Sequence, residues 1–124
     1  MNDRNRSIHS HALPNYERAV IPHEKLERYA LDPTHDYGKH KARVFKSALG
    51  FEQSNWQELS RSILDGIPYH EAVAGGEGPW GRKYIVTLSI TGPNGKTSDV
   101  QTVWIVRPGT DFPSLVTTLV AKER

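Results

Sequence analysis

The spacing of apolar residues changes at Gly66 from a helical pattern to a strand pattern. Before Gly66, Ala42, Phe45 and Leu49 recur at intervals of three or four positions, which places them on one face of a helix. After Gly66, every second residue of segment 84–90 is apolar, with Thr87 and Ser89 between the later ones, as in a strand with one buried face. The chain is therefore predicted to have an α+β fold, in which N-terminal helices pack on a C-terminal sheet.

About three helices are expected before Gly66. The first spans residues 23–31 and the second residues 38–49. The third is predicted to begin at a capping box, in which Ser54 is the N-cap and Gln57 the third helical residue.

Four strands are expected after Gly66. Short loops join them, which favours an antiparallel meander of consecutive strands. The predicted strands are residues 68–74, 84–90, 100–106 and 115–120, and a flexible glycine-rich loop is expected over residues 75–81.

A chain of 124 residues has the size of one domain. We expect that domain to cover residues 13–120. Residues 1–12 are polar and are interpreted as a disordered lead-in, and residues 121–124 as a frayed tail.

Composition argues against several classes of protein. The sequence has no cysteine, which excludes disulfides, zinc-thiolate sites and thiol nucleophiles. It has no apolar run of membrane-spanning length and no secretory segment at its start. The six histidines show no spacing typical of metal ligands. We therefore expect a cytoplasmic protein that uses no metal and no cofactor, and the oligomeric state is left open.

The start of the second predicted helix is the segment most suggestive of chemistry. His35 precedes it and Lys41 lies in its first turn, within a basic run that also holds Lys39, His40 and Arg43. A helix start attracts phosphate, and histidine transfers protons near neutral pH. Metal-free RNA cleavage needs such groups. The alternatives are that His35 only caps the helix and that the basic run is a solvated face.

Groups in the predicted strands are further candidates for the site. Arg107 directly follows the third strand, and Thr117 and Thr118 lie in the fourth. Side chains at strand ends are expected to approach His35 if one sheet face packs on the helices. Threonine is also an ordinary strand residue, so a purely structural role is equally compatible with the sequence. For Tyr84 and Trp104, a place in the core is expected.

Two blocks resemble an uncharacterised bacterial domain family. The first runs from Leu13 to Pro22 and continues through residues 25–26, 32–35 and 38–42. The second covers residues 104–109 and 113–118. Members of that family occur as short free-standing proteins and at the C-terminal ends of phage head-morphogenesis and polymorphic-toxin proteins. The order of elements is also similar, at the level of the fold, to the barnase, EndoU, colicin and RelE superfamily of metal-independent ribonucleases.

The resemblance implies a ribonuclease-like toxin that acts on RNA and is controlled by an antitoxin or immunity protein. It assigns acid/base chemistry to His35, phosphate contact to Lys41, and last-strand site roles to Arg107 and Thr117. The chain departs from the pattern at Ser114, where a basic residue is expected. An alternative function follows, that of a non-catalytic, phage-associated assembly module that docks an acidic partner through the basic helix.

Overall fold

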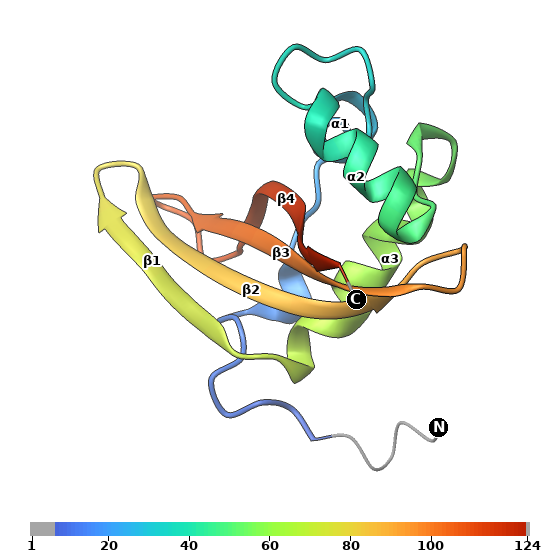
Figure 1. The fold of residues 1–124 in the computed structure, drawn as a ribbon. Helices are drawn as coiled ribbons and strands as arrows, with labels where there is room; N and C mark the ends of the chain where they lie inside the picture. The colour runs from blue at the N-terminus through green and yellow to red at the C-terminus, as the bar shows by residue number, and fades with distance from the viewer. Residues whose placement is uncertain (1–6, 124) are drawn as a thin grey trace.

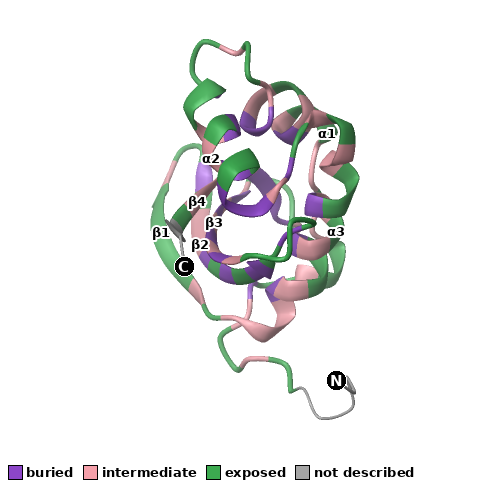
Figure 2. Ribbon diagram, turned by 45° about the vertical axis from the view of Figure 1, so that its right-hand side comes forward, coloured by how far each residue is buried: buried purple, intermediate pink, exposed green. Residues whose placement is uncertain are grey.

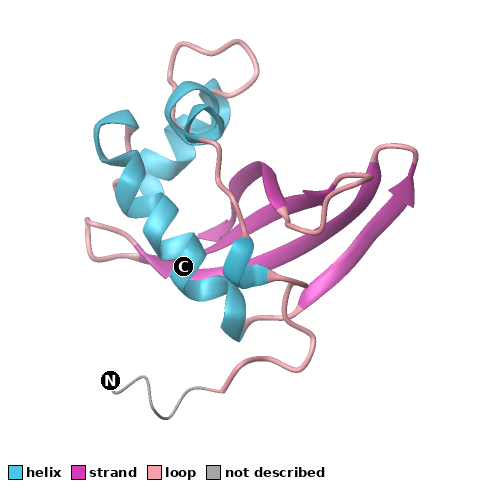
Figure 3. Cartoon of the chain, turned by 180° about the vertical axis from the view of Figure 1, so that it is seen from behind, coloured by secondary structure: helices cyan, strands magenta, loops and turns pink. Residues whose placement is uncertain are grey.

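The computed structural model describes residues 7–123, with helices grouped on one side of a twisted sheet (Figure 1). Figure 3 shows the same two layers from behind. The helical part comprises α1, a π-helical segment η3, α2 and α3, with 3₁₀ turns η2, η4 and η5 between them. Their bounds are α1 His23–Lys25, η3 Leu26–Ala30, α2 Lys39–Leu49, α3 Trp56–Gly66, η2 Tyr16–Arg18, η4 Gln53–Asn55 and η5 Ile67–Tyr69.

The sheet has four antiparallel strands in the order β1-β2-β3-β4. The strands are β1 Ala72–Gly78, β2 Gly81–Thr91, β3 Thr97–Val106 and β4 Ser114–Glu123. The predicted α+β class, with helices preceding an antiparallel meander, is confirmed.

The second predicted helix is confirmed in detail. Ala42, Phe45 and Leu49 of α2 are buried, and Gly50 ends the helix in the left-handed conformation with φ 83°. Its N–H donates to the carbonyls of Phe45 and Lys46, both at 3.0 Å, as expected of a glycine C-cap.

Two local helix predictions need correction. The first helix is a short α-turn, α1, that continues as the π-helical segment η3, where the Leu31 N–H donates to the Leu26 carbonyl at 2.9 Å. The capping box lies two residues earlier than predicted and joins Glu52 to Asn55. It moves because the chain makes the 3₁₀ turn η4 before α3 begins.

The glycine-rich segment is part of the sheet rather than a flexible loop. Strand β1 extends through Gly78, and Gly76, with φ 115°, accommodates a shift of register after Ala74. Glycine tolerates that conformation, so pairing with β2 continues past the bulge. At the other end β1 begins at Ala72 and not at Pro68, because residues 67–69 form η5.

Both chain ends are more regular than predicted where they are described. Residues 1–6 of the predicted lead-in and Arg124 lie outside the described residues. The His9 N–H donates to the Pro68 carbonyl at 2.9 Å, and the Ala72 N–H donates to the His11 carbonyl at 2.8 Å. Residues 121–123 continue β4.

The core lies between the helices and the inner face of the sheet (Figure 2). Trp104 of β3 is fully buried there, as are Phe45 of α2 and Ile63 of α3. The Trp104 indole N–H donates to the Thr102 hydroxyl at 2.8 Å, which donates to the Val86 carbonyl at 2.7 Å. These bonds satisfy the indole N–H and the hydroxyl, which would be costly to bury without partners. Tyr84 packs on the same core and is partly buried.

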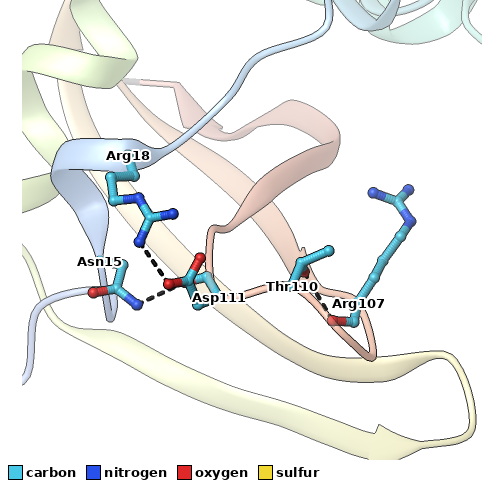
Figure 4. A network of polar contacts seen from close by, with 5 residues as sticks. All are labelled: Asn15, Arg18, Arg107, Thr110 and Asp111. Atoms are coloured by element: carbon cyan, nitrogen blue, oxygen red, sulfur yellow. Dashed lines mark hydrogen bonds and ion pairs between the residues drawn. The ribbon is translucent and has the colours of Figure 1, made fainter.

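The segment before α1 is attached to the first residues of β4. Val20 pairs with Ser114, and backbone hydrogen bonds join it to Pro113 and Leu115, both at 2.9 Å. Figure 4 shows a second attachment, in which Arg18 and Asn15 both donate to Asp111, each at 2.6 Å. The helical layer is thereby fixed beside β4, the strand that borders the candidate site.

Candidate functional site

A groove of about 530 Å³ lies between the α1–η3 segment and β4. The α1–η3 segment contributes Glu24, Lys25, Arg28 and Tyr29, the following loop contributes His35, and β4 contributes Val116 and Thr117. The lining carries two cations and one acid, so the groove is net positive when His35 is neutral. It has the volume of a small-ligand pocket.

Lys41, Tyr29 and Thr117 form a cluster of hydrogen bonds at this groove. The Lys41 ammonium donates to the Tyr29 phenol oxygen at 2.5 Å and to the Thr117 hydroxyl at 3.0 Å. The same ammonium lies 4.5 Å from the centroid of the Tyr29 ring. One cation thus connects α2, η3 and β4, and it is held by two side chains that line the groove.

The charge of Lys41 changes the chemistry of Tyr29. Its hydrogen bond lowers the pKa of the Tyr29 phenol below the ordinary value of 10.0. Burial opposes this effect on the pKa, while a hydrogen bond with Thr117 and the charges of Lys41 and Lys25 add to it. A larger fraction of Tyr29 is therefore deprotonated, and able to accept a proton, at a given pH than of an isolated tyrosine.

His35 fixes the loop in front of the groove. Its Nδ1 accepts hydrogen bonds from the N–H groups of Tyr37 and Gly38, both at 3.0 Å. Because Nδ1 is an acceptor, the proton of the neutral ring is on Nε2, which is left to act as a donor. The His35 carbonyl accepts the Lys39 N–H at 3.0 Å. These three N–H groups at the start of α2 are therefore occupied and are not open to phosphate.

The His35 ring packs edge-on against Tyr29, with centroids 4.9 Å apart and ring planes at 79°. Gly38 makes this packing feasible. A Cβ at position 38 would lie 2.1 Å from the Tyr29 carbonyl oxygen and 3.1 Å from its Cδ1. Only glycine permits the loop to approach Tyr29 so closely, and the approach places His35 at the groove.

Arg107 does not join this cluster. It lines a different cavity, of about 260 Å³, with Glu77 and Arg82. Thr117 pairs with Val103 of β3. Arg107 lies four positions after Val103 in the chain, which is a distance of about 13 Å along an extended strand. Figure 4 shows the Arg107 guanidinium extending away from Thr110, whose N–H and hydroxyl donate to the Arg107 carbonyl. Of the two sheet residues to which the resemblance assigns a site role, Thr117 lies at the site and Arg107 does not.

The remaining candidate residues lie outside the groove lining. Thr118 is fully buried, and its hydroxyl donates to the Gln101 carbonyl at 2.8 Å. Lys39, His40 and Arg43 are exposed on α2. Lys39 and Arg43 line another groove on a different side of the helix from Lys41. His40 remains a surface residue at the start of α2.

Tyr29 is the residue that sequence reasoning missed. In the sequence it resembles an inward-facing helical residue, and it is in fact packed partly on the core. Its hydroxyl nevertheless reaches Lys41, twelve positions later in the chain. No local motif reports such a pair, although a tyrosine one turn after Lys25 and directly after Arg28 was an available signal.

These observations define an α+β domain with a cationic groove built around a lysine–tyrosine pair. The chain belongs to the family described as "Domain of unknown function (DUF6883)", which matches residues 12–122. The expected membership of an uncharacterised domain family is thus confirmed. Comparison with curated proteins and with solved structures gave no match. Among the helices of residues 7–123, none has the length and apolar character needed to cross a membrane.

Proposed function

We propose that this chain is a metal-independent, ribonuclease-like toxin domain that cleaves RNA phosphodiesters in the cytoplasm. The observation that supports the proposal best is the convergence of Lys41, Tyr29 and Thr117 at a groove that Lys25 and Arg28 make positive. Such a groove attracts a phosphate backbone. It also supplies a proton acceptor beside a cation, as phosphodiester cleavage requires.

The proposed roles follow from the contacts. Tyr29, with its lowered pKa, is the general base. Lys41 is the cation that stabilises charge on the phosphorane and the acid for the leaving group. His35 donates from Nε2 to a phosphate oxygen, because its Nδ1 already accepts two backbone N–H groups. This assignment moves the base from His35, where the resemblance puts it, to Tyr29.

The reaction balances within this group of residues. The Tyr29 phenolate takes the proton of a ribose 2′-hydroxyl, whose oxygen attacks the adjacent phosphorus. The bond to the 5′-oxygen breaks, and that oxygen takes a proton from Lys41. The products are a 2′,3′-cyclic phosphate and a 5′-hydroxyl. Tyr29 then returns its proton to Lys41 along the hydrogen bond that joins them, which regenerates both groups.

The test is incubation of the purified chain with total RNA in the presence of EDTA. Discrete cleavage is expected, together with growth arrest when the chain is expressed in bacteria. Lys41→Met is expected to slow cleavage by about 10²–10³-fold. The matched control is Lys96→Met, because Lys96 is exposed in the β2–β3 turn. Intact RNA at every pH from acidic to alkaline, without a growth defect, would contradict the proposal and favour a non-catalytic module.

A further inference from the structure

A second groove, of about 490 Å³, lies on another side of α2 from Lys41. We define the α2 docking groove by its apolar residues Leu31, Pro33, Ala42 and Phe51, its cations Lys39, Arg43 and Lys46, and its polar residues Glu52, Gln53 and Ser54. It shares no lining residue with the groove between the α1–η3 segment and β4, which we call the Tyr29 groove. The two grooves are therefore separable by substitution.

The cations of the α2 docking groove form one row on the helix. Lys39, Arg43 and Lys46 are spaced i, i+4 and i+7, which places them on the same face. Lys46 lies 3.4 Å from Glu52, but both side chains are at least half exposed. Among the described residues, Lys39 and Arg43 have no acidic partner. Lys39 and Arg43 therefore present uncompensated positive charge beside the apolar residues of the groove.

The chemistry of this groove selects a protein segment rather than RNA. Single-stranded RNA sites combine cations with exposed aromatic rings on which bases stack. The aromatic residue of this groove, Phe51, is 2% exposed and so offers no free face. Pro33, which is exposed in the same groove, instead offers a surface for an apolar side chain. Carboxylates on either side of that side chain would meet the row of cations.

We propose that the α2 docking groove binds an acidic segment of a partner protein, with an apolar side chain on Pro33 and carboxylates on Lys39 and Arg43. The groove adjoins the loop that holds His35, because Leu31 and Pro33 lead directly into it. A bound partner would therefore contact the same loop that borders the Tyr29 groove. The proposal itself does not depend on RNA cleavage.

The test uses a short synthetic peptide that alternates glutamate and leucine, added to the isotopically labelled full chain and followed by NMR. Saturable shifts are expected at the amides of α2 docking groove residues, with little change at Tyr29 and Thr117. Arg43→Glu combined with Lys39→Glu should weaken binding by about tenfold or more. The matched control, Arg61→Glu in α3, should bind like the wild type.

A charge-reversed peptide distinguishes loss of the site from loss of the fold. The doubly reversed variant is expected to gain affinity for a lysine–leucine peptide, which the wild type should bind poorly. A glutamate–glycine peptide should bind the wild type less tightly, since it lacks the apolar contact. The proposal is overturned if the glutamate–leucine peptide does not bind, if its shifts map to the Tyr29 groove, or if a uridine oligonucleotide occupies the α2 docking groove instead.

Discussion

The Lys41 ammonium donates to the phenol oxygen of Tyr29 over 2.5 Å, and this bond joins the start of α2 to η3 at the edge of β4. The pair lies at a groove that is also lined by two further cations, Lys25 and Arg28. The pair places a proton acceptor, Tyr29, in direct contact with a proton donor, Lys41.

The pH dependence of cleavage should report Tyr29. A base works only when deprotonated, so the rate should rise with pH until it levels at the lowered pKa of Tyr29, below 10.0. In Tyr29→Phe this rise of the cleavage rate with pH should disappear, and the rate itself should fall by a factor of about 10²–10⁴. Thr117→Val removes a hydrogen bond that lowers the pKa of Tyr29. In this variant the rise of the cleavage rate should therefore occur at higher pH. Thr87→Val, at an exposed position of β2, is the control. An unchanged profile in Tyr29→Phe would remove Tyr29 from the mechanism.

His35 should matter more to the loop than to proton transfer. His35→Ala removes the acceptor of two backbone N–H groups and should cost about 1 kcal/mol in the free energy of unfolding, as for a lost helix cap. His35→Asn restores a side-chain acceptor and should recover most of that stability. Urea denaturation measures both. If His35 were the general base, the Asn variant would be as inactive as Tyr29→Phe; we expect it to retain more activity.

Gly38→Ala should disturb the site through packing. The new Cβ would lie 2.1 Å from the Tyr29 carbonyl oxygen, so the loop and η3 must separate. A cost of about 1–3 kcal/mol in the free energy of unfolding is expected, as for other overpacked positions. The control is Gly66→Ala, where the added Cβ meets only Leu88 side-chain carbons at 3.7 Å. Equal stability of the two variants would show that the loop does not need its close approach to Tyr29.

Asp32 should contribute stability that is lost at low pH. The hydroxyl and the N–H of Thr34 donate to its carboxylate, at 2.7 and 2.9 Å, and hold the pKa of Asp32 below its ordinary value of 3.8. A lowered pKa in the folded state means that the contribution is present above 3.8 and disappears as the pH falls through the lowered pKa. The stability difference between wild type and Asp32→Ala should therefore shrink in acid, as measured by urea denaturation across the pH range. A constant difference would contradict this assignment.

Most of the fold could be predicted from the spacing of apolar residues in the sequence. The spacing of Ala42, Phe45 and Leu49 and the alternation of segment 84–90 are each enforced by burial on one face, so both are visible in the sequence. The π-helical segment η3 and the bulge at Gly76 were not predicted. Each depends on how the chain meets a neighbouring element, and neither leaves a repeating pattern.

The candidate site was predicted only in part, for a related reason. The approach of Lys41 to Thr117 followed from packing the apolar face of α2 on the sheet. The register that pairs Thr117 with Val103 also leaves Arg107 at another cavity, and loop lengths alone do not define that register. Tyr29 was missed because its ring packs on the core while its hydroxyl reaches Lys41. A tyrosine with two such roles resembles an ordinary core residue in sequence.

The most direct test of the central claim uses a DNA oligonucleotide that carries a single ribonucleotide, incubated with the chain in EDTA and analysed by mass spectrometry. We expect one cut, directly after the ribonucleotide, with a 2′,3′-cyclic phosphate on one product and a 5′-hydroxyl on the other. Lys41→Met and Tyr29→Phe should each suppress that cut, whereas Lys96→Met should not. Cleavage at deoxynucleotides, or cutting at the ribonucleotide that survives both substitutions, would contradict the proposed role of the Lys41–Tyr29 pair.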